Sequence, residues 1–190
     1  MRIFILLTLL LTACASSNKS DDQFNQWLAQ AESGQAEAQY KLGTIYTTNK
    51  DYANALIWLQ KSANQNNPKA QNGLSMLYMQ GLGVPKDEQK ALEWLKKSAE
   101  AGYPTAQYNV AMLYKNGRLL AKDDVQAALW LQQAAQQGDT QAQVQLALCY
   151  EQGVGVQQDT RSALEWLEKA SAKNNAEAKA HLQRIQKNLR

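Results

Sequence analysis

Few residues of this chain have side chains suited to acid–base, nucleophilic or metal chemistry. The 190 residues include two cysteines, Cys14 and Cys149, and a single histidine, His181. One histidine excludes a zinc site of the His-Glu-x-x-His type and any histidine cluster. No glycine-rich loop followed by lysine is present to hold a phosphate group. We therefore expect no catalytic residues, no cofactor and no metal site, and we interpret the chain as a binding protein and not an enzyme.

The first cysteine follows a short apolar segment. Arg2 precedes an apolar run over residues 3–11, and Leu11-Thr12-Ala13-Cys14 ends it with small residues and a thiol. The run is too short to cross a bilayer and is typical of a secretory signal. An ordinary signal peptide with an incidental cysteine is the alternative. The pattern resembles the lipobox of bacterial lipoproteins, which implies cleavage before Cys14 and lipidation of its thiol and new amino terminus.

The resemblance also implies a location. Ala15 stands where an aspartate would retain a lipoprotein in the inner membrane, so we expect attachment to the outer membrane of a Gram-negative cell, facing the periplasm. The polar segment that follows Cys14 is typical of a flexible tether, and its eight residues reach at most about 29 Å.

A 36-residue period organises the rest of the chain. It separates Trp58, Trp94, Trp130 and Trp166, and the same step separates alanines at 70, 106, 142 and 178. A period of this size with helical patterning indicates a solenoid of two-helix units. At strict repeat positions the tryptophans are predicted to pack between helices and not to stack on a ligand.

The first helix of each unit carries the string Ala-Gln-x-x-Leu-small-x-apolar-Tyr, starting at Ala38, Ala70, Ala106 and Ala142. Positions one, five, eight and nine fall on one face of a helix, which predicts that they form the core. Cys149 occupies position eight and is therefore predicted to be buried, without a disulfide partner. The small residue at position six would let a neighbouring helix approach closely.

The second helix of each unit has matching start and stop signals. It follows an aspartate, the type of residue that caps free amides at a helix start. It closes at a glycine or asparagine, the residues that accept a left-handed conformation. The aspartates are Asp51, Asp87, Asp123 and Asp159, and the closing residues are Asn66, Gly102, Gly138 and Asn174.

The loops from Gly81 and Gly153, together with the recurring tyrosine and Ala-x-x-Trp, resemble the Sel-one-like repeat, a relative of the tetratricopeptide repeat. The resemblance implies an all-α, right-handed α-solenoid of four helix-turn-helix repeats with partial caps at both ends. Two units depart from the pattern. The first has a shorter loop and looks like a plain tetratricopeptide unit. The third has Leu119 where Gly83 and Gly155 stand, so its loop is expected to bend differently.

The predicted organisation has eight segments. They are a signal peptide (1–13), the lipidated cysteine and tether (14–22), an N-terminal capping helix (23–35), repeat 1 (36–67), repeat 2 (68–103), repeat 3 (104–139), repeat 4 (140–175) and a C-terminal capping helix (176–190).

A partner surface is predicted on the first helices, at string positions three, seven and ten, opposite the core face. Many of these side chains are apolar or aromatic, where a solvated face would be polar. The candidates are Tyr40, Asn72, Met76, Met79, Tyr108, Met112, Val144 and Leu148. The alternative is that tight packing of neighbouring units buries position three or seven.

These features predict a membrane-anchored periplasmic scaffold that binds a protein on the concave side of the solenoid. Known relatives act in envelope assembly, or as immunity lipoproteins against lipase-type effectors of type VI secretion systems. The net charge of +3 without a basic stripe does not support a nucleic-acid partner. No small-molecule substrate is expected.

An enzyme is the alternative from another class. Some cysteine-rich helical-repeat relatives have been linked to β-lactams, but this chain lacks their cysteine pairs. Ser16-Ser17-Asn18-Lys19 matches the Ser-x-x-Lys motif of penicillin-recognising enzymes, on the tether and without the partner motifs.

Overall fold

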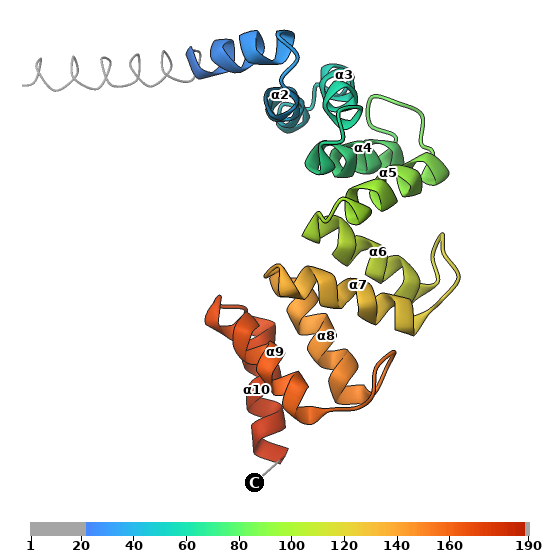
Figure 1. The fold of residues 1–190 in the computed structure, drawn as a ribbon, viewed down its shortest axis with the longest axis vertical. Coiled ribbons are helices and arrows are strands. Elements are labelled where there is room, and N and C mark those ends of the chain that lie inside the picture. Colours follow the sequence, from blue (N-terminus) through green and yellow to red (C-terminus); the bar gives the residue numbers. More distant parts are fainter. Residues whose placement is uncertain (1–21, 189–190) are drawn as a thin grey trace, which may run out of the picture. The chain divides into compact units, whose positions relative to one another are not determined.

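A computed structural model describes residues 22–188 and shows helices joined alternately by short turns and, within repeats 2 to 4, by longer loops (Figure 1). Residues 22–32 are helical. The following helices are α2 (Ala36–Thr48), α3 (Tyr52–Ala63), α4 (Pro68–Gln80), α5 (Glu88–Glu100), α6 (Pro104–Asn116), α7 (Asp124–Gln136), α8 (Thr140–Gln152), α9 (Thr160–Ala172) and α10 (Ala176–Asn188). The signal peptide, Cys14 and the tether up to residue 21 lie outside the described residues. The all-α class and the paired helix-turn-helix repeats are confirmed.

The helix boundaries follow from the local signals in each repeat. Asp51, Asp87, Asp123 and Asp159 each cap the helix that follows, accepting a hydrogen bond from an amide of its first turn. The four predicted closing residues have φ angles of 63° (Asn66), 87° (Gly102), 86° (Gly138) and 62° (Asn174). Pro68 and Pro104 begin α4 and α6, where a missing amide hydrogen has no cost. These predictions are confirmed.

The chain divides after Lys86 into two compact units. In the first unit, Trp27 and Leu28 from the helix over residues 22–32 pack against Ala38 and Leu42 of α2. A Cβ on Gly43 would lie 2.6 Å from Cγ of Leu59, so the small residue at string position six is what allows α3 to approach α2. Close packing here depends on the missing side chain.

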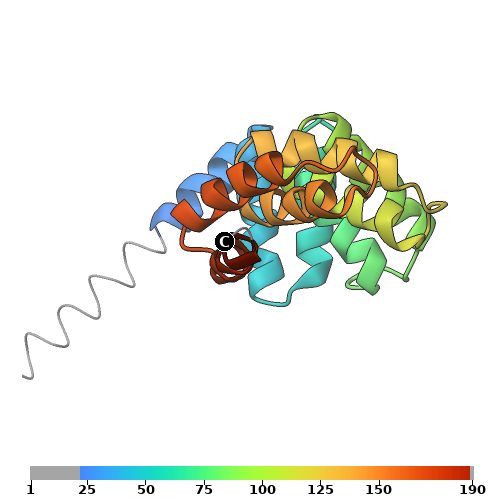
Figure 2. The ribbon, with the colours of Figure 1, turned by 90° about the horizontal axis from the view of Figure 1, so that it is seen from below.

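The second unit contains α5 to α10, in which consecutive helices pack against each other (Figures 1 and 2). One cluster of this unit joins Leu131 of α7 to Leu146 and Cys149 of α8, with Trp130 and Trp166 packed against it half-buried. Cys149 is 5% exposed, as predicted from its repeat position. The last helix, α10, packs on α9 through Ala178 and Ile185. The handedness of the array stays a prediction.

The loop of repeat 3 does not bend differently at Leu119, so that expectation is wrong. Leu119 has a φ of 62°, beside 68° at Gly83 and 72° at Gly155. The glycines are needed for a second reason, since a Cβ on Gly83 would lie 2.5 Å from the Tyr52 carbonyl oxygen. The turn geometry is thus kept in all three loops, while leucine must adopt a conformation that costs about 1 kcal/mol or more.

Buried glutamines tie each first helix to the preceding second helix. They occupy string position two and donate from Nε2 to the carbonyl oxygen eight residues earlier, over 3.0 to 3.4 Å. The pairs are Gln39–Ala31, Gln71–Ala63, Gln107–Ala99 and Gln143–Ala135. Because a buried amide without a partner costs about 1–3 kcal/mol, these bonds define how the two helices meet. None of the helices in the described part of the chain is long and apolar enough to cross a membrane.

Candidate partner-binding surface

The predicted binding residues of the first unit lie on α2 and α4 with part of their surface accessible. Met76 of α4 is 38% exposed, one of the few large apolar side chains with so much contact with solvent. Tyr40, Asn72 and Met79 are half-buried. We call these four residues the unit-1 surface. Its centre is a flexible thioether side chain of the kind that adapts to varied partners.

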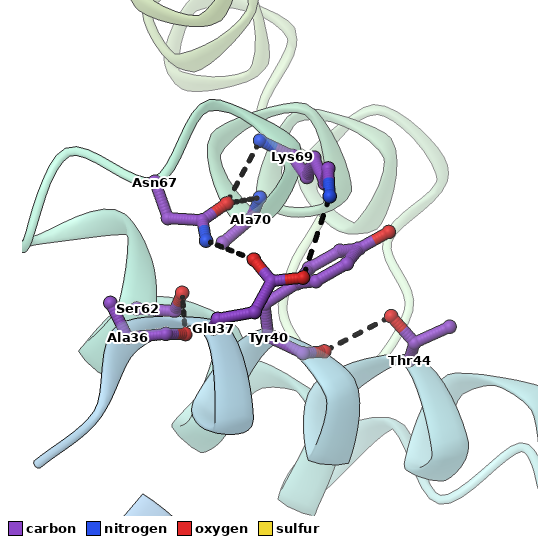
Figure 3. Close-up of polar contacts among 8 residues, drawn as sticks. All are labelled: Ala36, Glu37, Tyr40, Thr44, Ser62, Asn67, Lys69 and Ala70. Carbon is purple, nitrogen blue, oxygen red and sulfur yellow. Dashed lines mark hydrogen bonds and ion pairs between the residues drawn. The ribbon is translucent and has the colours of Figure 1, made fainter.

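A polar network holds the Tyr40 end of the unit-1 surface (Figure 3). Lys69 of α4 pairs with Glu37 of α2 at 3.4 Å, and its ammonium lies 5.6 Å from the centre of the Tyr40 ring. Asn67 donates from Nδ2 to the other carboxylate oxygen of Glu37 at 3.2 Å. The same Asn67 side chain accepts hydrogen bonds from the amides of Lys69 and Ala70, which caps α4. Glu37 and Lys69 were not among the predicted residues; their charges become neighbours because the helices stack.

In the second unit the corresponding side chains are in part packed against the core. Tyr108, Met112 and Leu148 are half-buried, and the first two pack against the cluster that contains Leu131 and Cys149. Burial raises the pKa of the Tyr108 phenol, and the nearby carboxylates of Asp139 and Glu177 raise it further. Tyr108 and Met112 therefore serve the core as well as the surface. We call Tyr108, Met112 and Leu148 the unit-2 surface.

Val144 does not belong to a binding surface, and its prediction is corrected here. It is fully buried and packs with Leu167 and Ala170 of α9 and Ala178 of α10. The alternative considered for string position three, burial by the neighbouring unit, holds at this residue. The reason is that residues of both α9 and α10 cover this side of α8.

Charged and polar groups border the unit-2 surface. Lys115 donates to Gln145 Oε1 at 2.7 Å, and Arg184 of α10 pairs with Glu151 of α8 at 2.6 Å. Arg184 also lies 3.0 Å from Nδ1 of His181. His181 thus contacts, on its own helix, the arginine that joins the capping helix to repeat 4.

Side chains suited to chemistry are sparse among the described residues. Within residues 22–187 no group of three or more histidine, cysteine or acidic side chains could hold a metal ion. Burial raises the pKa of the Cys149 thiol, which disfavours the reactive thiolate. An open hollow at the loop of repeat 4 is lined by Tyr150, Val156 and Asp159, whose carboxylate accepts a 2.6 Å hydrogen bond from Ser162. That bond lowers the pKa of Asp159, which stays an ordinary ionised acid.

Comparison with known proteins identifies the family. The model of the Sel1 repeat matches residues 36–67, 68–103, 104–139 and 140–175. The chain therefore belongs to the Sel1 repeat family, and it is a helical-repeat scaffold of the kind that generally binds proteins. No curated protein matches it significantly.

Solved structures show the same architecture. A Sel1 repeat protein from Oxalobacter formigenes is 32% identical, with a TM-score of 0.82 over 85% of this chain and 48% of its own. The protective antigen c5321 of uropathogenic Escherichia coli is 35% identical, with a TM-score of 0.75 over 82% of this chain and 34% of its own. This chain thus spans half or less of either relative. Helicobacter pylori cysteine rich protein B shares the fold at 23% identity, with a TM-score of 0.52 over 65% of this chain and 94% of its own.

Proposed function

We propose that this chain is a membrane-anchored periplasmic scaffold that captures a protein partner on the exposed faces of its first helices. The observation that carries the proposal is Met76, 38% exposed on α4 beside the half-buried Met79. Exposed apolar groups rimmed by polar ones mark interaction surfaces, and methionine and tyrosine are enriched there.

The rim of the unit-1 surface supports recognition of a protein. Glu37 and Lys69 neutralise each other at 3.4 Å and leave no strong net charge beside Tyr40. A neutral, mixed rim around an apolar centre is the usual composition of a protein–protein contact. It is a poor site for a polyanion, which needs clustered Lys and Arg.

The N-terminal motif supports the location. Leu11-Thr12-Ala13-Cys14 followed by Ala15 is the basis for lipidation at Cys14 and for the outer membrane, facing the periplasm. A tether of about 29 Å at full extension would hold the repeats near the bilayer. We expect Cys14→Ser to release the protein from the membrane fraction and Ala15→Asp to move it to the inner membrane. Retention of the Cys14→Ser variant in the membrane fraction would contradict anchoring.

A finer form of the proposal names the partner as a lipase-type effector of a type VI secretion system, with this chain as its immunity protein. A scaffold held near the membrane is well placed to meet an enzyme that acts on membrane lipid. The test is to express a lipase encoded beside this gene in the periplasm, with and without the chain. Protection from its toxicity and a complex of the two purified proteins are expected.

The binding surface itself is tested by a matched pair of variants in the first unit. Met76→Glu places a charge in the unit-1 surface, whereas Ile57→Glu places one at a comparably exposed position, 50%, on α3. Both should retain the wild-type helical circular dichroism and thermal midpoint. Loss of the partner complex with Met76→Glu but not with Ile57→Glu is expected. Equal binding by both variants would exclude the unit-1 surface.

The enzyme alternative has a direct test as well. The purified chain is expected not to hydrolyse a chromogenic β-lactam. In the described residues the cysteine available for a disulfide is Cys149, which is buried and free.

A further inference from the structure

The outer face of α7 in repeat 3 carries an exposed apolar ridge. Val125 is 56% exposed and Leu129 is 48% exposed. They are four residues apart, so they lie one above the other on the same side of the helix. A leucine and a valine that both keep about half of their surface in water are an unusual pair. Each forgoes roughly 1 kcal/mol or more of the free energy that burial in the core would provide.

The neighbouring repeats of the second unit have polar groups at these positions. One 36-residue step from Val125 and Leu129 leads to Gln89 and Glu93 on α5, and to Arg161 and Glu165 on α9. Arg161 and Glu165 form an ion pair at 3.2 Å. Two steps before Leu129, Ile57 on α3 is also apolar and 50% exposed, but Ala53 stands at the position of Val125. The pair of large apolar side chains is therefore particular to repeat 3.

The face around the ridge is also without net charge. The charged residue of α7 is Asp124, and Lys122 neutralises it at 3.4 Å. Gln133 stands where Lys97 and Lys169 cover Trp94 and Trp166 at 4.5 and 3.9 Å from the ring centres. An uncharged apolar face imposes no repulsion on an identical face, unlike the corresponding positions of α5 and α9.

We propose that the α7 ridge is a contact between two copies of this chain, related by a two-fold axis that passes between Val125 and Leu129, with the two α7 helices antiparallel. Symmetric dimers use one self-complementary patch twice. Trp166 of α9 packs on the cluster that includes Leu131 of α7, so α9 flanks the ridge. In this arrangement Arg161 of one copy comes to the level of Glu165 of the other, and the reverse pair forms by symmetry.

The size of the face sets the strength of the contact. A helix of 13 residues is about 20 Å long and about 10 Å wide. Each copy thus buries a few hundred Å², below the roughly 800 Å² per partner of a stable dimer. Self-association should accordingly be weak and visible only at high protein concentration.

Sedimentation velocity of the full chain over increasing concentration tests the proposal. The average mass should rise toward that of two chains, and Leu129→Glu should weaken the association about tenfold or more, as expected for a charge placed in an apolar contact. Ile57→Glu, an equally exposed position on α3, is the control and should associate like the wild type. Circular dichroism checks that both variants are folded. A chain that stays monomeric throughout, or one that Leu129→Glu leaves unchanged, would overturn the proposal.

Charge exchange on α9 tests the arrangement. Arg161→Glu and Glu165→Arg should each weaken association, because each places like charges opposite one another. The double variant Arg161→Glu/Glu165→Arg should restore it, since it re-forms both reciprocal pairs and also the pair within α9. A double variant no better than the single ones would rule out this two-fold contact. Dissociation by Ile57→Glu would assign self-association to another surface.

Discussion

Gln137 donates a hydrogen bond of 2.7 Å from its side-chain amide to the side-chain oxygen of the buried Gln107. Gln107 in turn donates to the carbonyl oxygen of Ala99 and to Gln133 Oε1, each at 3.2 Å. One side chain on α6 therefore joins the last turn of α5 to the last turn of α7. Because Gln107 is almost fully buried, water cannot take the place of a hydrogen-bond partner that its side chain loses.

The first prediction concerns this bond. Gln137→Ala leaves the oxygen of Gln107 buried without a donor, which should lower the free energy of unfolding by about 1–3 kcal/mol. Urea denaturation followed by circular dichroism measures it. Gln136→Ala, at an exposed position one residue earlier, should change stability by less than about 0.5 kcal/mol. Equal effects of the two substitutions would show that the hydrogen bond contributes little.

The second prediction compares two glycines of the second unit. Gly102 and Gly155 both have positive φ, but a Cβ on Gly102 meets no atom within 4 Å, whereas one on Gly155 overlaps the carbonyl of Asp124. Gly102→Ala should cost about 1 kcal/mol, the strain of the left-handed conformation. Gly155→Ala should cost about 2 kcal/mol more, because the loop must move away from α7. Thermal unfolding of both variants checks the order, and a Gly102→Ala variant as unstable as Gly155→Ala would contradict the close contact.

The third prediction concerns the thiol of Cys149, whose pKa is raised by burial. The native protein should alkylate slowly at this residue at about pH 8, because reaction needs the exposed thiolate. Mass spectrometry of the peptide containing Cys149 measures the modified fraction, and denaturant should increase the rate strongly. Fast labelling of the folded protein would show that repeat 4 opens readily.

The raised pKa of Cys149 also makes the stability of the folded protein depend on pH. A thiol with a raised pKa in the folded state contributes fully below its ordinary pKa of about 8.5, and the contribution is lost as the pH rises above that value. Stability should therefore fall from about pH 8.5 upward by more in the wild type than in Cys149→Ala. Parallel pH profiles of the two proteins would contradict this.

The fourth prediction separates the causes that raise the pKa of Tyr108. Burial is the largest, followed by the charges of Asp139 and Glu177. Asp139→Asn removes one charge while an asparagine can still cap α8, as Asp139 does through the amide of Ala142. The phenolate absorbance near 295 nm, taken as the difference from Tyr108→Phe, should then appear at a lower pH. It should still lie above that of an exposed tyrosine, and an unchanged titration would exclude the influence of Asp139.

The helix boundaries were predictable from the sequence because they depend on neighbouring residues. A capping aspartate such as Asp123 accepts from an amide three residues away, at 2.9 Å, and a closing residue such as Gly138 needs a particular φ of its own. The buried glutamines also had a signal, since one recurs at string position two of every unit. That signal was missed because a polar residue on a helix is usually taken as solvated.

The candidate surface could be predicted in part. Of the positions opposite the core on α2 and α4, Met76 is exposed as expected, whereas Tyr40, Asn72 and Met79 are half-buried. Val144 could not be assigned correctly, because its burial depends on α9 and α10 and not on its own helix. The exposed ridge on α7 was not anticipated, since the pattern search followed the first helices.

The sequence by itself determined the repeat, its two helices, their caps and the burial of Cys149, because these follow from a 36-residue period and from bonds between near neighbours. The tertiary structure alone decided how side chains from different helices meet. It paired Gln107 with Gln137 and Lys69 with Glu37, and it removed Val144 from solvent. The physical reason is that burial and pairing belong to surfaces shared by two or three helices, and the position of a residue in its own repeat does not specify what covers it.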